Sequence, residues 1–97
     1  MTDIFGTMYY VYLIKSLKNA RYYVGQTQDL EERVKRHNQG RNISTKSYMP
    51  WQLRWWKGYE TRSDAIKVET KIKGIKKRVE VEKFLKENNF RGVAQSG

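Results

Sequence analysis

The sequence predicts an α+β domain in which helices flank a small three-stranded antiparallel sheet. Two short segments rich in aromatic and β-branched residues are separated by a polar turn, as in a β-hairpin. A third segment of the same kind lies between stretches that have the apolar periodicity of helices. The element order is therefore β-β-α-β-α-α, in one domain that spans residues 1–97.

The hairpin is expected to bring two tyrosines onto one face of the sheet. Its strands are predicted over 8–14 and 22–26, and the segment between them has the composition of a turn. A turn centred between Lys18 and Asn19 pairs even-numbered residues of the first strand with odd-numbered residues of the second. Tyr12 and Tyr23 then share a face, whereas a turn longer by one residue would place them on opposite faces.

A short helix is expected directly after the hairpin, over residues 30–38. Asp29 has the position of its N-cap, three residues before a glutamate, and Gly40 is a typical helix end. Arg33 and His37 are four residues apart on this helix, so they lie on the same side of it and both border its apolar face. The pair can therefore point at one spot on the sheet.

A polar loop and a third strand occupy the middle of the chain. Residues 41–49 are polar and are expected to form the most mobile loop, and Pro50 excludes a helix at the junction. The strand is predicted over 51–59 and contains three tryptophans. Because side chains alternate between the two faces of a strand, these tryptophans cannot all be buried.

Two further helices are predicted after the third strand. The first should begin at a cap formed by Thr61 or Ser63. Gly74 costs about 1 kcal/mol relative to alanine inside a helix, which predicts a break near it. The last helix is expected over 79–88, and a disordered tail from about residue 91. The core-facing stripe of these helices is predicted to comprise Ala65, Val68, Ile72, Ile75 and Val79.

The charge of the chain points to a polyanionic partner. Lysine and arginine number 20 against 10 acidic residues, which gives a net charge of +10. Nucleic acid is the first expectation and an anionic membrane surface the second. Cysteine is absent, which excludes disulfides and thiolate metal sites. No apolar run approaches the roughly 20 residues that span a bilayer, and no secretory signal is evident, so we expect a soluble, cytoplasmic protein.

Four side chains near the hairpin have the chemistry to act on a phosphodiester. The guanidinium of Arg33 is always charged and matches phosphate oxygens. The imidazole of His37 can hydrogen-bond phosphate or transfer a proton. The phenols of Tyr12 and Tyr23, with an ordinary pKa of about 10, become useful bases only beside a cation. The alternative for each is purely structural: a solvated arginine, a half-buried histidine and two packing tyrosines.

Glu69 is the candidate metal ligand. On a helical wheel it lies between Ala65 and Ile72, at the edge of the apolar stripe, where a carboxylate is half-shielded. A single carboxylate can hold Mg²⁺ when waters and substrate phosphates complete the coordination shell. No second acidic cluster is visible, so a two-metal site is not supported. The alternative is a rim residue paired with Lys73 or Lys76.

Basic residues elsewhere are candidates for contact with nucleic acid. Residues 71–78 hold five positive charges in eight positions, and three more candidates lie in the loop and the third strand. Contact with phosphate would release counterions, although a solvated helix face is the alternative. One of the tryptophans could also stack on an unpaired base. The basic candidates are Lys46, Arg54, Lys57, Lys71, Lys73, Lys76, Lys77 and Arg78.

The two strand triplets resemble those that give the GIY-YIG nuclease superfamily its name. Tyr10-Val11-Tyr12 stands where that family has its first triplet, and Tyr23-Val24-Gly25 where it has the second. The similarity continues through the helix that delivers an arginine to the helix that bears Glu69, and it is greatest to the short, single-domain bacterial members. Tyr10 replaces the glycine of the first triplet, and the helix after Glu69 is rich in lysine and valine where many relatives carry an asparagine.

This resemblance implies an endonuclease that hydrolyses DNA with one divalent metal. Structure selectivity and a role in DNA repair are the finer expectations. Glu69 would hold Mg²⁺ or Mn²⁺, and Arg33 would stabilise the phosphate. Tyr12 or Tyr23 would orient or deprotonate the attacking water, and His37 would support the phosphate or a tyrosine.

Two other functions stay open at this point. One is a catalytically weak or inactive module that binds nucleic acid on the same scaffold, and the other is a subunit whose helices dock on a partner protein. A homodimer also stays open.

Overall fold

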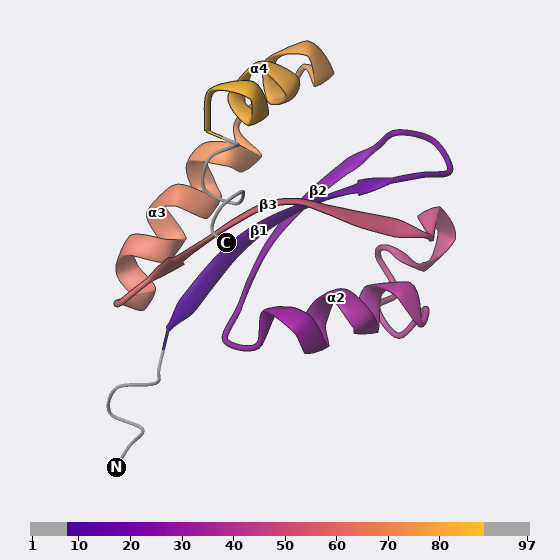
Figure 1. The fold of residues 1–97 in the computed structure, drawn as a ribbon, viewed down its shortest axis with the longest axis horizontal. Coiled ribbons are helices and arrows are strands. Elements are labelled where there is room, and N and C mark those ends of the chain that lie inside the picture. The colour runs from indigo at the N-terminus through magenta and orange to yellow at the C-terminus, as the bar shows by residue number, and fades with distance from the viewer. Residues whose placement is uncertain (1–7, 89–97) are drawn as a thin grey trace.

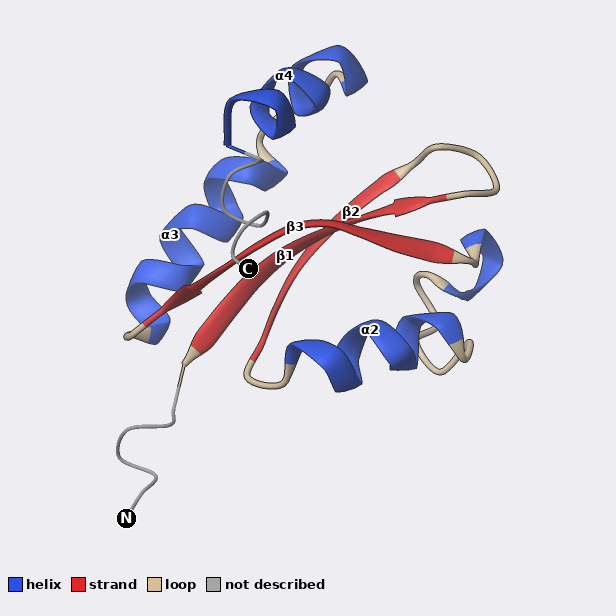
Figure 2. Cartoon of the chain, in the orientation of Figure 1, coloured by secondary structure: helices blue, strands red, loops and turns tan. Residues whose placement is uncertain are grey.

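Three antiparallel strands form the centre of the molecule in the computed structural model, which describes residues 8–88 (Figure 1). The sheet order is β2-β1-β3, so β2 and β3 are its edges. The predicted fold class and the predicted order of elements are confirmed (Figure 2). The predicted tail from residue 91 lies outside the described residues. The strands are β1 (Tyr9–Ser16), β2 (Tyr22–Thr27) and β3 (Trp51–Tyr59).

Helices cover both faces of the sheet. Figure 1 shows α2 on one face and α3 with α4 on the other. None of the helices between residues 8 and 88 has the length and apolar character needed to cross a membrane. The helices are α2 (Leu30–Asn38), α3 (Arg62–Lys73) and α4 (Arg78–Asn88), and a single 3₁₀ turn (Lys46–Tyr48) precedes β3.

The hairpin has the predicted register. Tyr12 lies opposite Gly25 and Ile14 lies opposite Tyr23, so the turn is centred between Lys18 and Asn19. Tyr12 and Tyr23 therefore occupy the same face, and their ring centroids are 6.5 Å apart. This is the face that α2 covers, and it carries the candidate phenols.

A bulge in β3 divides the tryptophans between the two faces of the sheet. Leu13 pairs with Trp55 whereas Ile14 pairs with Leu53, so Arg54 is an extra residue in β3. Trp51 is consequently buried with Tyr12 on the α2 face, and Trp55 is buried in the core beneath α3. Trp56 is 40% exposed, which confirms that the three tryptophans are not all buried.

Two hydrophobic clusters hold the helices against the sheet. The larger cluster joins β1, β2 and β3 to α3 and α4, and the smaller one lies under α2. The larger comprises Val11, Leu13, Val24, Trp55, Ala65, Ile72, Val81 and Leu85. The smaller comprises Tyr12, Ile14 and Trp51, with Leu30 and Val34 of α2 packed against it.

Side-chain caps fix where the helices begin. Asp29 accepts a hydrogen bond from the backbone N–H of Glu32 at 3.1 Å, as expected for the N-cap of α2. Thr61, rather than Ser63, caps α3 by accepting from the backbone N–H of Asp64 at 3.1 Å. Each cap satisfies one of the backbone donors that a helix start leaves unpaired.

The break at Gly74 is confirmed, and it changes the face that the last helix buries. Helix α3 ends at Lys73 with Gly74 as its C-cap, and α4 begins at Arg78. The prediction that Val79 continues the core-facing stripe is wrong, because Val79 is 67% exposed. The non-helical link interrupts the phase of the apolar repeat, so Val81 and Leu85 are the buried residues of α4.

The segment 41–49 is anchored more firmly than its polar composition suggests. Thr45 is only 1% exposed, and its backbone carbonyl accepts a hydrogen bond from the indole N–H of Trp51 at 2.9 Å. Asn38 accepts from the backbone N–H of Trp51 at 2.6 Å and donates to the Trp51 carbonyl at 3.0 Å. The mobility predicted for this segment stays a prediction.

Replacing Gly25 by alanine should destabilise the protein. A Cβ at position 25 would lie 2.5 Å from the Tyr12 hydroxyl oxygen, and Tyr12 is buried and cannot move freely. Overpacking of this kind costs about 2 kcal/mol, which lowers Tm by roughly 10 °C in a domain of this size. Thermal unfolding followed by circular dichroism measures the effect.

Gly74→Ala is the matched control, because a Cβ there meets only backbone oxygens at 3.4 Å and 3.7 Å. Equal loss of stability in the two variants would contradict the close approach of Tyr12 to Gly25.

Candidate active site

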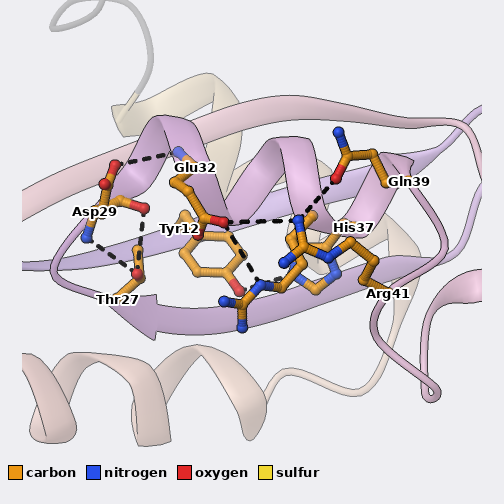
Figure 3. Close-up of polar contacts among 8 residues, drawn as sticks. Tyr12, Thr27, Asp29, Glu32, His37, Gln39 and Arg41 are labelled. Atoms are coloured by element: carbon orange, nitrogen blue, oxygen red, sulfur yellow. Dashed lines mark hydrogen bonds and ion pairs between the residues drawn. The ribbon is translucent and has the colours of Figure 1, made fainter.

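Tyr12 is the more buried of the two candidate tyrosines. Its side chain is 1% exposed, and its hydroxyl lies 2.9 Å from Nε2 of His37 (Figure 3). Burial raises the pKa of Tyr12 to about 12; the neighbouring Tyr23 acts in the same direction and Arg33 in the opposite one. Tyr12 is therefore a protonated phenol at neutral pH.

His37 joins Tyr12 to the segment before β3. The imidazole is fully buried, and its Nδ1 lies 2.8 Å from the hydroxyl oxygen of Thr45. Burial lowers the pKa of His37 to about 4, and the positive charges of Arg33 and Arg36 lower it further. The ring is therefore neutral at neutral pH, with one nitrogen that donates and one that accepts.

The hydrogen bonds around His37 assign its tautomer. The hydroxyl of Thr45 is in position to donate to the carbonyl of Asn42, at 3.4 Å, which leaves a lone pair of Thr45 to accept from Nδ1–H of His37. Nε2 is then the acceptor of a hydrogen bond that the Tyr12 hydroxyl donates. This assignment gives every member of the buried chain a partner: Tyr12 to His37, His37 to Thr45, and Thr45 to Asn42.

Arg33 lies beside Tyr12 and has a donor that no described residue satisfies. Its charge lowers the pKa of Tyr12, which places the guanidinium close to the phenol. Within residues 8–88, the buried Nε of Arg33 has no hydrogen-bond partner. The buried Nε of Arg36 lacks a hydrogen-bond partner among these residues in the same way, so this feature does not by itself distinguish Arg33. Arg33 lines an open cavity of about 360 Å³ together with Gln26 and Arg62.

Glu69 approaches the same edge of the sheet from the other face. Its side chain is 18% exposed and forms an ion pair with Lys73 at 3.2 Å. Its second oxygen accepts from the side-chain amide of Gln26 at 3.1 Å. Gln26 also lines the Arg33 cavity. Since β2 is an edge strand, Gln26 connects the guanidinium on one side with the carboxylate on the other. The charge of Glu69 adds to the causes that raise the pKa of Tyr12.

Tyr23 is part of an aromatic wall around His37. Its ring lies edge-on to His37 at 5.2 Å between centroids and edge-on to Trp51 at 6.3 Å. It is less buried than Tyr12. Both predicted phenols therefore border the imidazole, and only Tyr12 is hydrogen-bonded to it.

The eight predicted basic contacts are all exposed, but they belong to different parts of the molecule. Lys46 lies in the 3₁₀ turn after α2, Arg54 occupies the bulge of β3, and Lys57 lies over the ring of Tyr59. The other five belong to α3, to the start of α4 and to the link between them. Among those five, Lys73 forms the ion pair with Glu69.

Three site residues were not predicted from the sequence: Thr45, Gln26 and Arg62. Gln26 had a usable signal, because alternation along β2 places it on the face opposite Tyr23 and toward the helix of Glu69. Thr45 lies in a polar segment without periodicity, and nothing in that pattern distinguishes it. The guanidinium carbon of Arg62 lies 4.9 Å from the centroid of the Tyr9 ring. This contact depends on tertiary structure, so the sequence pattern does not predict it.

The model of the GIY-YIG catalytic domain matches residues 8–88, and the chain therefore belongs to the GIY-YIG family. The chain is 32% identical over 85 residues to a UPF0213 protein of Streptococcus pneumoniae, covering 87% of this chain and 84% of the relative.

Two further proteins are similar to the chain. A UPF0213 protein of Staphylococcus saprophyticus is 36% identical over 66 residues, covering 67% of this chain and 79% of the relative. The solution NMR structure of a UPF0213 protein from Bacillus halodurans has a TM-score of 0.55 and 24% identity, covering 87% of this chain and 88% of that one. This last similarity concerns the fold alone.

Stability should fall in acid because His37 is buried in its neutral form. The native state binds this proton only near pH 4, whereas the unfolded chain binds it below about 6.5. The unfolded state therefore holds more protons between these values, and stability is lost as pH falls through that window, by up to about 3 kcal/mol. Urea unfolding at pH 7 and pH 5 measures the loss.

His37→Gln is the control for this pH effect, because it removes the titrating ring. Its stability should change less between the two pH values than that of the natural protein. An identical change in both proteins would assign the effect to carboxylates instead.

Proposed function

We propose that the protein is a divalent-metal-dependent endonuclease that hydrolyses phosphodiester bonds in DNA. The observation that carries this proposal is the link through Gln26, whose side chain holds Glu69 and lines the cavity of Arg33. Arg33 lines this cavity, and the partly shielded carboxylate of Glu69, which does not line it, is linked to it by the hydrogen bond from Gln26. The phenol of Tyr12 lies within the influence of both charges.

The chemistry of Glu69 fits a hard cation such as Mg²⁺ or Mn²⁺. Within residues 8–88, no group of three or more acidic, histidine or cysteine side chains could hold an ion. One carboxylate is nevertheless sufficient for Mg²⁺ when waters and substrate phosphates supply the other ligands. The ammonium of Lys73 lies against this carboxylate, so a metal would have to displace it. A bound metal would polarise the phosphate and activate a water.

The protein's own residues position the substrate and the water. Arg33 lines the cavity, where its guanidinium would stabilise negative charge on the phosphate in the transition state. Tyr12 donates a hydrogen bond to His37 and is only 1% exposed, so the attacking water could donate to its oxygen only once the side chains that cover it shift on substrate binding. Because its pKa is about 12, Tyr12 orients this water rather than acting as a preformed base. Tyr23 remains the second candidate for this role.

The proposed substrate is duplex or branched DNA, and a role in DNA repair follows from branched substrates. A net charge of +10 favours binding to a polyanion, with an affinity that falls as salt rises. The eight exposed basic residues are the proposed phosphate contacts, since each has a solvent-accessible charge. A DNA substrate also favours a cytoplasmic location. Assembly with a second copy or a partner protein is compatible with this function.

A second candidate function is a nucleic-acid-binding module with weak or no activity. The ion pair between Lys73 and Glu69 favours it, because a carboxylate that is already neutralised binds a cation less strongly. Such a module would bind DNA in a salt-sensitive manner without cutting it. Binding that survives loss of both Glu69 and Arg33 would support this second function.

Cleavage should depend on Glu69 and Arg33. With nicked, flapped or plain duplex DNA and Mn²⁺ or Mg²⁺, we expect Glu69→Gln and Arg33→Ala each to lower the rate by about a hundredfold or more, because each removes a charge needed in the transition state. Gel analysis of end-labelled DNA measures the rate. Glu80→Gln, on exposed α4, is the control. Cleavage by Glu69→Gln at the natural rate would overturn the proposal.

Thr45 should act as a positioning residue for Tyr12 through His37. Thr45→Val keeps the shape but removes the acceptor for Nδ1–H, so His37 can change tautomer and release Tyr12. We expect a fall in kcat on the order of tenfold to a hundredfold, with ¹⁵N NMR of the imidazole reporting the tautomer. Thr45→Ser keeps the hydroxyl and should retain both the natural kcat and the natural tautomer of His37. An unchanged tautomer in Thr45→Val would contradict this role.

A further inference from the structure

An apolar groove lies on the side of α2 away from the Arg33 cavity. Its volume is about 650 Å³, within the range of pockets that bind small molecules. Trp56 of β3 forms one wall, and its side chain is 40% exposed although it is among the largest apolar residues of the chain. Tyr10 meets the Trp56 ring edge-on, with centroids 5.8 Å apart. The remaining apolar walls are Leu30, Val34 and Leu53.

The groove and the Arg33 cavity meet at one corner of the molecule. Gln28 and Asp29, which connect β2 to α2, line both. The first turns of α2 separate them: Glu31 and Lys35 border the groove, whereas Arg33 borders the cavity. A nucleic-acid strand whose phosphate is bound at Arg33 would therefore pass this corner and bring a neighbouring nucleotide to the groove.

The chemistry of the groove favours an uncharged aromatic occupant. Its charged lining residues are Asp29, Glu31 and Lys35, so two negative charges face one positive charge. Phosphate groups and anionic lipids are disfavoured there, whereas in the Arg33 cavity the guanidiniums of Arg33 and Arg62 balance the carboxylates of Asp29 and Glu32. A nucleobase has flat faces that stack on an indole, and its amino groups can donate to carboxylates. Asp29 already caps α2, which leaves Glu31 as the freer acceptor.

We propose that this groove binds one unpaired nucleobase of the strand that is held at Arg33, by stacking it on Trp56. The inference rests on the proposed function and narrows its substrate to DNA that has an unpaired base beside the cleaved bond. A fully paired base cannot enter the groove, because its faces are covered by its neighbours in the duplex. The exposed Trp56 thus supplies substrate selection, and the Arg33 cavity supplies the chemistry.

The test measures binding without cleavage, in the Glu69→Gln protein and in buffer free of divalent cations. Fluorescence anisotropy compares three labelled duplexes: one fully paired, one with a single unpaired nucleotide, and one with an abasic site at that nucleotide. We expect the unpaired base to raise affinity about tenfold over both others, since stacking on an aromatic residue requires the base itself. Trp56→Ala should abolish this preference and leave binding to the paired duplex unchanged, and Trp56→Phe should retain most of it.

Three results would overturn the proposal. The abasic duplex could bind as tightly as the unpaired base, or Trp56→Ala could keep the preference. Sedimentation could instead show a dimer that Trp56→Ala dissociates, which would assign the groove to contact between copies. If the natural protein did not cleave DNA with Mg²⁺ or Mn²⁺ but still preferred the unpaired base in the binding assay, only the proposed function would be rejected. The two proposals therefore fail separately.

Discussion

The hydrogen bond between the hydroxyl of Tyr12 and Nε2 of His37 is the contact on which the rest of the site depends. It joins the central strand to α2, and Thr45 extends it to the segment before β3. The phenol reaches His37 across Gly25, where any side chain would collide with it. Strand β1, helix α2 and the polar segment are thus held in place by one buried chain of polar groups. A buried network is stable only if each member is satisfied.

Burial gives the two sides of the site different properties. Beneath α2, Tyr12 and His37 are kept neutral, because desolvation raises the pKa of the phenol and lowers that of the imidazole. At the edge of β2, Arg33 borders an open cavity and Glu69 is partly exposed. The neutral pair therefore gives fixed geometry, and the charged pair lies where water, ions and phosphates can enter. This division suits hydrolysis of a charged substrate by a very small domain.

The sequence predicts the fold well where local patterns decide the structure. The register of the hairpin, the Asp29 cap and the break at Gly74 follow from turn length, capping chemistry and glycine. Val79 was misassigned, because a periodic pattern cannot show that the phase restarts after a break. Thr45 was missed for a similar reason, since its burial depends on contacts with distant residues.

The candidate site was predicted to different degrees. The four-residue spacing on one helix predicted that Arg33 and His37 lie on the same side. The resemblance to the family supplied the proposed role of Glu69. Helical spacing alone placed Glu69 at the rim of the core and offered Lys73 as its partner, and that ion pair is present. The part played by Gln26 depends on β2 being an edge strand, which follows from strand order rather than from sequence.

The bulge at Arg54 makes the length of β3 more critical than its composition. Before this residue the strand contributes Trp51 to the wall of His37, and after it the strand contributes Trp55 to the opposite core. A substitution at one of these positions affects one side of the sheet. A deletion of one residue would reverse the facing of every side chain on one part of the strand. Small insertions and deletions in β3 would therefore damage the aromatic wall around His37 and the hydrophobic core under α3 together, although neither contains Arg54.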